Sequence, residues 1–260
     1  MSAIEFEKRV SESQASIENC DLDSCPRIES LTRAAMDVAN EEVSEAAVVN
    51  DAVVSIVAGM SKKNKEIVKD SVLYASLRAD SDFPDGGVQW YNAFKTYLGN
   101  CGWPPQSAGL SGYTVSNSRF TMEQEGLKIL ASAITAAALP GPTSALMLKV
   151  AKDAMDVLQS SEKPLRLFES SSKKYSGAKF AIVSAVEIDE EVVMTLGAVD
   201  FNTSINVTNV LFWEWNSSTV KIKRAESCLI LNQRHFEDIA KTLREKLTEN
   251  ARKAVLEFDI

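Results

Sequence analysis

The stretch ILASAITAAALPGPTSALML, residues 129–148, contains no charged side chain over twenty consecutive positions. A Pro-Gly-Pro at 140–142 divides it, because proline and glycine end a helix. We therefore expect one helix over 121–139 and a second over 143–159. Neither helix reaches the ~20 residues that a straight membrane span requires. The pattern predicts a helical hairpin that packs in the core of a domain folded in water.

Beyond residue 165 the apolar residues change from a helical spacing to the period of two that is typical of strands. The expected strands cover 178–186, 192–199, 205–215 and 219–224, and a short one follows at 227–231. The first two strands are apolar on both faces, which favours a sheet with helices on either side. A closing amphipathic helix is expected to begin near Asn232.

The first part of the chain has the pattern of helices. Residues 24–57 combine an N-cap serine, a proline in the first turn and apolar residues at helical spacing. Two further helices are expected over 64–78 and around 90–98. Residues 1–60 hold 12 acidic side chains against 4 basic ones, and we expect residues 1–23 to form an acidic flexible arm.

Helices first, then strands, then a closing helix is an order typical of an α+β protein. We expect a sandwich-like single domain over 24–260, in which helices cover an antiparallel sheet built from the C-terminal half. The helical part is 24–160, and the sheet with its closing helix occupies 165–260. No charged or Pro/Gly-rich linker divides these parts.

The composition argues against several classes of function. A net charge of −8 disfavours a nucleic-acid partner. Because the chain has one histidine and its cysteines lack CxxC spacing, we expect no metal site. The sequence contains neither a Walker loop nor a GxGxxG motif, so we expect no cofactor. The charged N-terminus lacks the apolar region of a signal peptide, so we expect synthesis in the cytoplasm. No catalytic motif predicts an enzyme, and a Cys228–His235 nucleophile pair is the remaining enzymatic alternative.

An aromatic run gives the first indication of a function. The segment NVLFWEW, residues 209–215, places one phenylalanine and two tryptophans in one expected strand. Such residues normally fill a sheet core, but tryptophan also suits a membrane interface, where one end of the side chain stays wet. The hairpin over 121–159 allows the same two interpretations, because its apolar faces suit a bilayer surface once they leave the sheet. The candidate membrane-contacting residues are Leu127, Ile129, Leu130, Leu139, Leu146, Leu148, Leu211, Trp213 and Trp215.

Three segments follow one another after the hairpin: YSGAKFAIVSAV (175–186), VVMTLGAVDF (192–201) and INVTNVLFWEWNSSTVKIKRAESCLIL (205–231). Together with the hairpin, over about residues 121–240, they resemble the Cyt-type cytolytic δ-endotoxins of insect-pathogenic bacteria. An aromatic-rich strand holds the same place in that family. The Evf-type virulence factors are a related group that the chain also resembles.

The resemblance implies a single domain with helical hairpins on both faces of an antiparallel sheet. It also implies permeabilisation of bilayers without enzymatic chemistry, and a protoxin whose arm, residues 1–23, is removed by proteolysis. The leading hypothesis is a cytolysin-like virulence protein that is released, binds the lipid of a target-cell membrane and self-associates there. The alternative is a non-lytic virulence or interaction protein with the same fold, lipid-anchored at Cys228 or Cys101.

Overall fold

The structure is a computed structural model of the whole chain, and it describes residues 3–22, 29–30, 43–104, 109–174, 176–205 and 207–258. The helices are α1 (Ala3–Glu18), α2 (Lys62–Asp82), α3 (Gly87–Asn100), α4 (Met122–Ala136), α5 (Thr143–Gln159), α6 (Glu162–Ser172) and α7 (Gln233–Phe258). The strands are β1 (Glu29–Ser30), β2 (Glu45–Val49), β3 (Ala52–Ile56), β4 (Ser111–Tyr113), β5 (Arg119–Phe120), β6 (Lys173–Lys174), β7 (Gly177–Ile188), β8 (Glu191–Thr203), β9 (Trp215–Asn216) and β10 (Val220–Ile230), and a short 3-10 helix, η1 (Ser217–Thr219), precedes β10.

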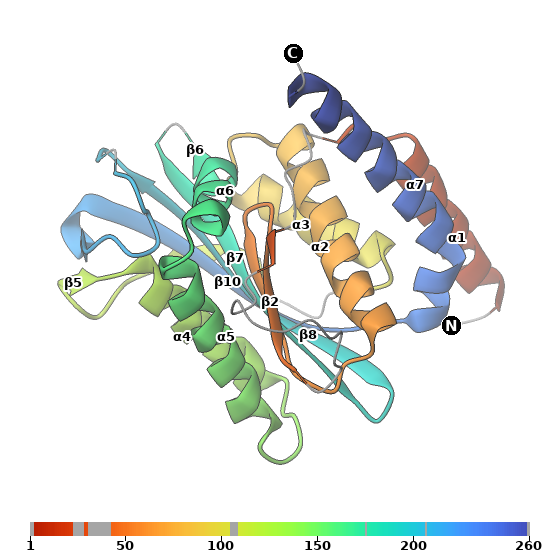
Figure 1. Cartoon of the computed structure of the whole chain (residues 1–260), viewed down its shortest axis with the longest axis horizontal. Coiled ribbons are helices and arrows are strands. Elements are labelled where there is room, and N and C mark those ends of the chain that lie inside the picture. Colours follow the sequence, from red (N-terminus) through yellow and green to blue (C-terminus); the bar gives the residue numbers. More distant parts are fainter. Residues whose placement is uncertain are drawn as a thin grey trace.

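An eight-stranded sheet with the order β1-β2-β3-β7-β8-β10-β4 forms the centre of the molecule, and β6 pairs with β7 beside this path. Helices cover both faces of the sheet, with α2 and α3 on one side and α4, α5 and α6 on the other (Figure 1). Helices α1 and α7 lie against each other outside the α2–α3 side (Figure 1). The prediction of a single α+β domain with a sheet between helices is confirmed.

The expectation of a purely antiparallel sheet is wrong. Strands β7, β8 and β10 pair antiparallel over long registers, but β3 runs parallel to β7, with Ala52 opposite Ala181. Parallel neighbours require a crossover. Here the crossover is the whole chain from α2 to α6, which passes over both faces of the sheet.

The expectation of a helix over 24–57 is also wrong where the structure describes residues 43–57. Residues 45–56 form the β2–β3 hairpin, whose turn contains Asn50 at a φ of 55°. The apolar residues of this segment fit both a helical and a strand period. The valines favour strands, and asparagine tolerates the left-handed conformation of the turn, so the segment forms a hairpin. Residues 23–28 and 31–42, where the first helix was expected to begin, lie outside the described residues.

The N-terminal segment is an ordered helix in place of the expected flexible arm. Helix α1 buries Phe6, Val10, Ser13 and Ile17, and it packs against α7 and α3. These buried residues recur every three or four positions, a spacing that predicts an amphipathic helix even though the segment is acidic overall. The domain therefore includes residues that composition alone assigned to an arm.

The expected strand over 205–215 is absent from the described part of that segment. The chain there makes turns, and only Trp215 enters a strand, β9, which pairs with β5. Asn209 has a φ of 61°, a conformation that ends an extended chain. The expected strands at 219–224 and 227–231 are one continuous strand, β10.

Helix α6 was not expected, because a strand period was predicted beyond residue 165, whereas the other helices after residue 60 and the long strands agree with their predictions. Strands β7 and β8 match the two segments expected to be apolar on both faces, and successive residues of β7 enter opposite cores: Ala181 and Val183 on the α2–α3 side, Phe180 and Ile182 on the α4–α5 side. Helix α4 begins after Thr121, whose side chain accepts a hydrogen bond from the amide of Gln124. The period-two pattern thus defined both cores.

Helix α4 approaches the sheet more closely than side chains on both partners would allow. A Cβ atom on Gly197 of β8 would lie 2.9 Å from the backbone nitrogen of Leu130. A Cβ atom on Gly126 of α4 would lie 2.6 Å from Cδ1 of Ile182. Because glycine has no Cβ atom, these two positions allow the backbone of α4 to lie directly against the sheet.

Substitution Gly197→Ala is expected to lower the free energy of unfolding by ~1–3 kcal/mol, because the added methyl group meets backbone that cannot rotate away. Urea denaturation measures the change. The matched control is Gly112→Ala in β4, where an added Cβ meets nothing within 4 Å. Equal stability of the two variants would show that the close approach of α4 is not constrained by Gly197.

Candidate membrane-contacting surface

The α4–α5 hairpin is a surface layer and not an enclosed core element. One side of α4 lies on β8, β10 and β7, and one side of α5 lies on β3 and β7. Ile129 and Leu130 are fully buried on that inner side, whereas the outer side of the hairpin faces solvent (Figure 1). The apolar face is therefore covered from one direction only.

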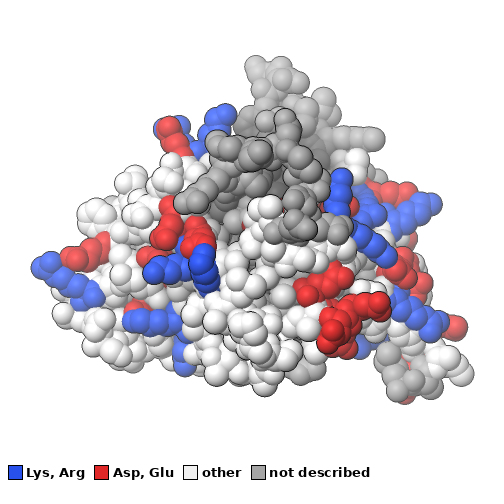
Figure 2. Space-filling model, turned by 60° about the horizontal axis from the view of Figure 1, so that its bottom comes forward, with Lys and Arg blue, Asp and Glu red and all other residues white. Residues whose placement is uncertain are grey.

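The corner between the two helices is exposed and uncharged. Pro140, Gly141 and Pro142 are exposed, Leu146 is 43% exposed, and Leu139 is half-buried. Figure 2, in which the bottom of Figure 1 comes forward, shows a broad uncharged area bordered by acidic and basic side chains. The uncharged residues around the Pro-Gly-Pro turn are thus exposed at the surface.

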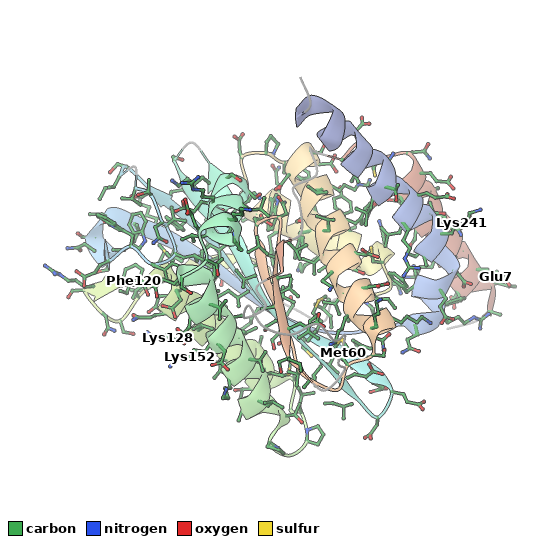
Figure 3. The ribbon with its side chains drawn as sticks, in the orientation of Figure 1. Glu7, Met60, Phe120, Lys128, Lys152 and Lys241 are labelled. Carbon is green, nitrogen blue, oxygen red and sulfur yellow. The ribbon has the colours of Figure 1, made fainter. Side chains whose placement is uncertain are left out.

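The opposite end of the hairpin, its base, is polar. Tyr113 of β4 donates a hydrogen bond to Glu125 Oε2 at 2.5 Å, and Lys128 donates to Glu125 Oε1 at 2.6 Å. Burial and the hydrogen bond to Glu125 raise the pKa of Tyr113 to about 12. Lys128 and Lys152 both lie on the outer side of the hairpin (Figure 3). The hairpin therefore has a charged base and an apolar corner.

The aromatic run lies at the base of the hairpin, away from its corner. The amide of Glu123, in the first turn of α4, donates to the carbonyl of Leu211 at 3.0 Å. The 15 residues of α4, about 22 Å of helix, separate this contact from the corner. Trp213 is 47% exposed, whereas Trp215 is 1% exposed and donates from Nε1 to the carbonyl of Val210.

The nine predicted membrane-contacting residues therefore do not form one surface. Two of them are exposed, at opposite ends of α4; three are half-buried; and four are buried in the core between sheet and hairpin. In that order they are Leu146 and Trp213; Leu127, Leu139 and Leu148; and Ile129, Leu130, Leu211 and Trp215. Only Leu146 belongs to the exposed uncharged corner.

The candidate cysteines differ in access. Cys101 is fully buried and its burial raises the pKa of the thiol, whereas Cys228 is half-buried on β10. Cys228 packs against the core on the hairpin side. His235 contacts Phe6 and Ser13 on the other side of the sheet. The Cys228–His235 pair that an enzymatic function would have required is therefore not formed.

A buried charged cluster that was not among the predicted sites lies on the α2–α3 side of the sheet. Lys179 of β7 donates to Asp51 Oδ2 at 2.5 Å and also to Asp80 Oδ1. Its ammonium lies 4.3 Å from the centroid of the Trp90 ring, and Trp90 Nε1 donates to Asp80 Oδ1 at 2.7 Å. Asn50 donates to the other oxygen of Asp80. One cation thereby links the β2–β3 turn, β7, α2 and α3.

Two carboxylates share this one ammonium, and the cluster is buried. Burial, together with the charge of Asp80, raises the pKa of Asp51 to about 7, although Lys179 acts in the opposite direction. For Lys179, burial lowers the pKa, but the two aspartates outweigh it and the pKa is raised. A lysine that is charged and fully paired is a structural link and not a nucleophile. The one sequence feature that could have predicted this cluster is the single lysine inside an apolar strand, GAKFAIV.

The described residues include neither a candidate metal site nor a helix suited to cross a membrane. No group of three or more His, Cys, Asp or Glu side chains in that part of the chain is placed to hold a metal ion. Among the described helices, none is both long enough and apolar enough to cross a membrane.

Substitution Lys179→Met is expected to lower the free energy of unfolding by ~3–5 kcal/mol, because it leaves Asp51 and Asp80 buried beside each other without their cation. Chemical denaturation at neutral pH measures the loss. The same change at the exposed Lys152 is the control and should alter stability by less than ~0.5 kcal/mol. A small effect at Lys179 would mean that the cluster does not stabilise the fold.

No protein-family model matches the chain, and no curated protein matches it. Among solved structures, the chain is similar to one described as "Structure of the Evf virulence factor", with a TM-score of 0.35 and 10% sequence identity. The match covers 94% of this chain and 89% of that chain. The Evf-type group is the second one named from the sequence, and membership of the Cyt-type family is not shown. A likeness at this TM-score supports no statement about family or activity, so the function is argued from the residues.

Proposed function

We propose that this protein is a membrane-binding, cytolysin-like virulence protein that contacts lipid through the corner of the α4–α5 hairpin. The observation that carries the proposal is the exposed corner, where Leu146 and the Pro-Gly-Pro turn lie within twenty residues without a charge. Exposed uncharged surface that includes apolar side chains is typical of sites that bind a partner or a membrane. No enzymatic chemistry is required for such contact.

The hairpin has an inner apolar face that suits lipid once the corner has made contact. Side chains such as Ile129 and Leu130 would pass from a protein core into acyl chains, which are similarly apolar, so their transfer costs little. The sheet face beneath them, with Phe180 and Ile182, would then need a new cover. Lipid or a second copy of the chain would supply it, and self-association on the membrane is therefore part of the proposal.

The outer side of the hairpin limits how deeply it enters. Lys128, Lys149, Lys152 and Asp153 are exposed along its length, and the one nearest the corner in α5, Lys149, comes seven residues after Pro142. Charged side chains remain at the level of the lipid headgroups, so the corner enters first. Because the corner carries no charge, binding should depend on apolar contact and only weakly on anionic lipid or salt.

The substitution Leu146→Asp is expected to weaken binding to phosphatidylcholine vesicles about tenfold or more, because an aspartate at the corner resists transfer out of water. Vesicle flotation measures binding, and release of an entrapped dye measures permeabilisation. Wild-type binding should change little when phosphatidylserine or salt is added.

The matched control is Val88→Asp in α3, an exposed apolar residue at 42% against 43% for Leu146. This variant should bind vesicles as the wild type does. Binding that both variants lose equally would remove the hairpin corner from the proposal. Wild-type protein that neither binds nor permeabilises vesicles of either composition would refute the proposed function.

The second candidate is a non-lytic virulence or interaction protein with the same fold, anchored by an acyl chain on a cysteine. The observation that favours it is that Cys228 is half-buried, whereas Cys20 and Cys101 are buried. Intact-mass measurement of protein from its native cells should then show a mass increase of one acyl chain, with Cys101 unmodified. A native mass equal to that of the bare chain would exclude this candidate.

A further inference from the structure

Helix α1 is the outermost layer on the α2–α3 side, and its apolar residues face inward. Phe6, Val10 and Ile17 join the core formed with α2, α3 and α7. Glu7 of α1 and Lys241 of α7 point away from the molecule (Figure 3). The contact between α1 and the rest of the fold is therefore mainly apolar, and these two charged side chains lie outside it.

The single histidine of the chain, His235, lies within this contact. Its side chain is 2% exposed, and Nε2 lies 3.1 Å from the carbonyl oxygen of Asn100 and 3.2 Å from Ser13 Oγ. The ring of Phe6 meets the imidazole edge-to-face, with the centroids 6.2 Å apart. One imidazole thus joins α1, α3 and α7.

The surroundings of His235 favour the neutral imidazole. The residue lies in the first turn of α7, where its amide donates to Asn232 Oδ1, and a helix N-terminus disfavours a positive charge. Burial lowers the pKa of His235 below its usual 6.5, and the charge of Arg9 on α1 lowers it further. The carbonyl of Asn100 and the carboxylate of Asp238 act in the opposite direction but do not outweigh burial.

Other cations surround the contact as well. Arg234 of α7 lies over the Phe6 ring at 4.7 Å. Arg78 of α2 donates to the carbonyl and the hydroxyl of Ser16, one turn further along α1. A second proton on the imidazole of His235 therefore adds a positive charge where α1 is already held between arginines.

We propose that mild acidification releases α1 from α3 and α7, and that His235 is the group that responds. A buried imidazolium requires water, and α1 is the element whose departure admits it at least cost. Of the three apolar core residues of α1, Ile17 is fully buried, but Phe6 and Val10 are at the rim of the core, with 9% and 8% of their surface exposed. The released helix presents an apolar side that is independent of the hairpin corner.

The sign of the effect follows from linkage. Because the pKa of His235 is lowered in the folded chain, the docking of α1 is at full strength above pH 6.5 and weakens as the pH falls through the folded-state value. Each unit of lowering corresponds to about a tenfold change in the opening equilibrium. Asp51, Asp70 and Glu123 have raised pKa values, so their protonation stabilises the fold over the same range and does not explain a loss.

Hydrogen exchange read by mass spectrometry tests the proposal on the full chain at about pH 7.5 and about pH 5, with intrinsic rates corrected. Amides of α1 should open more often at the lower pH, because the pKa of His235 is lowered in the folded chain, whereas those of α5 should not change. His235→Gln keeps a donor and an acceptor but does not titrate. In this variant α1 should show the same protection at both pH values.

Two results would overturn the proposal. One is unchanged protection of α1 in the wild type at the lower pH; the other is equal opening of α1 in His235→Gln. A second measurement does not depend on a variant that folds: one histidine gives one imidazole resonance, and its NMR titration reports the pKa directly. A midpoint at or above 6.5 would also refute the proposal, whatever the vesicle experiments show.

Discussion

Strands β7 and β8 are apolar on both faces, and the need to remove both faces from water governs the rest of the structure. Helices must cover each side, so the chain crosses from α2 and α3, past the edge strand β4, to α4, α5 and α6 before it returns to the centre of the sheet at β7. That crossover makes the parallel pairing of β3 with β7 possible. The α4–α5 hairpin, which contains the uncharged residues 129–148, is consequently a surface layer, because one layer of helices is enough to cover a sheet face.

The two helical sides are held by different kinds of contact. On the hairpin side, α4 meets the sheet through close packing at Gly126 and Gly197, and the polar contact with Tyr113 and Glu125 lies at the base. On the other side, polar joints cross the interfaces: Lys179 links four elements, and His235 links three. Apolar contact exchanges readily for lipid, whereas a polar joint responds to proton concentration. The proposed lipid contact and the proposed response to acid therefore involve opposite sides of the sheet.

Much of the fold was predictable because its signals are local. Hydrophobic period gave both long strands and both helices of the hairpin, and the Pro-Gly-Pro gave its corner. The errors arose where one segment fits two periods. Residues 45–56 contain enough valine for either a helix face or two strands, and the choice depended on pairing with β7. The apolar residues that lead to Trp215 alternate as in a strand, but the backbone of Asn209 has a left-handed conformation that turns the chain before Trp215.

The sequence by itself determined a single α+β domain, two apolar faces on the central strands, and an uncharged hairpin without a membrane span. These follow from composition and spacing along the chain. Only the tertiary structure decided which apolar residues are exposed, that Leu146 and Trp213 lie at opposite ends of α4, and that Asp51, Asp80 and Lys179 meet. Exposure and charge pairing depend on distances between residues that are far apart in the chain, and spacing carries no information about those distances.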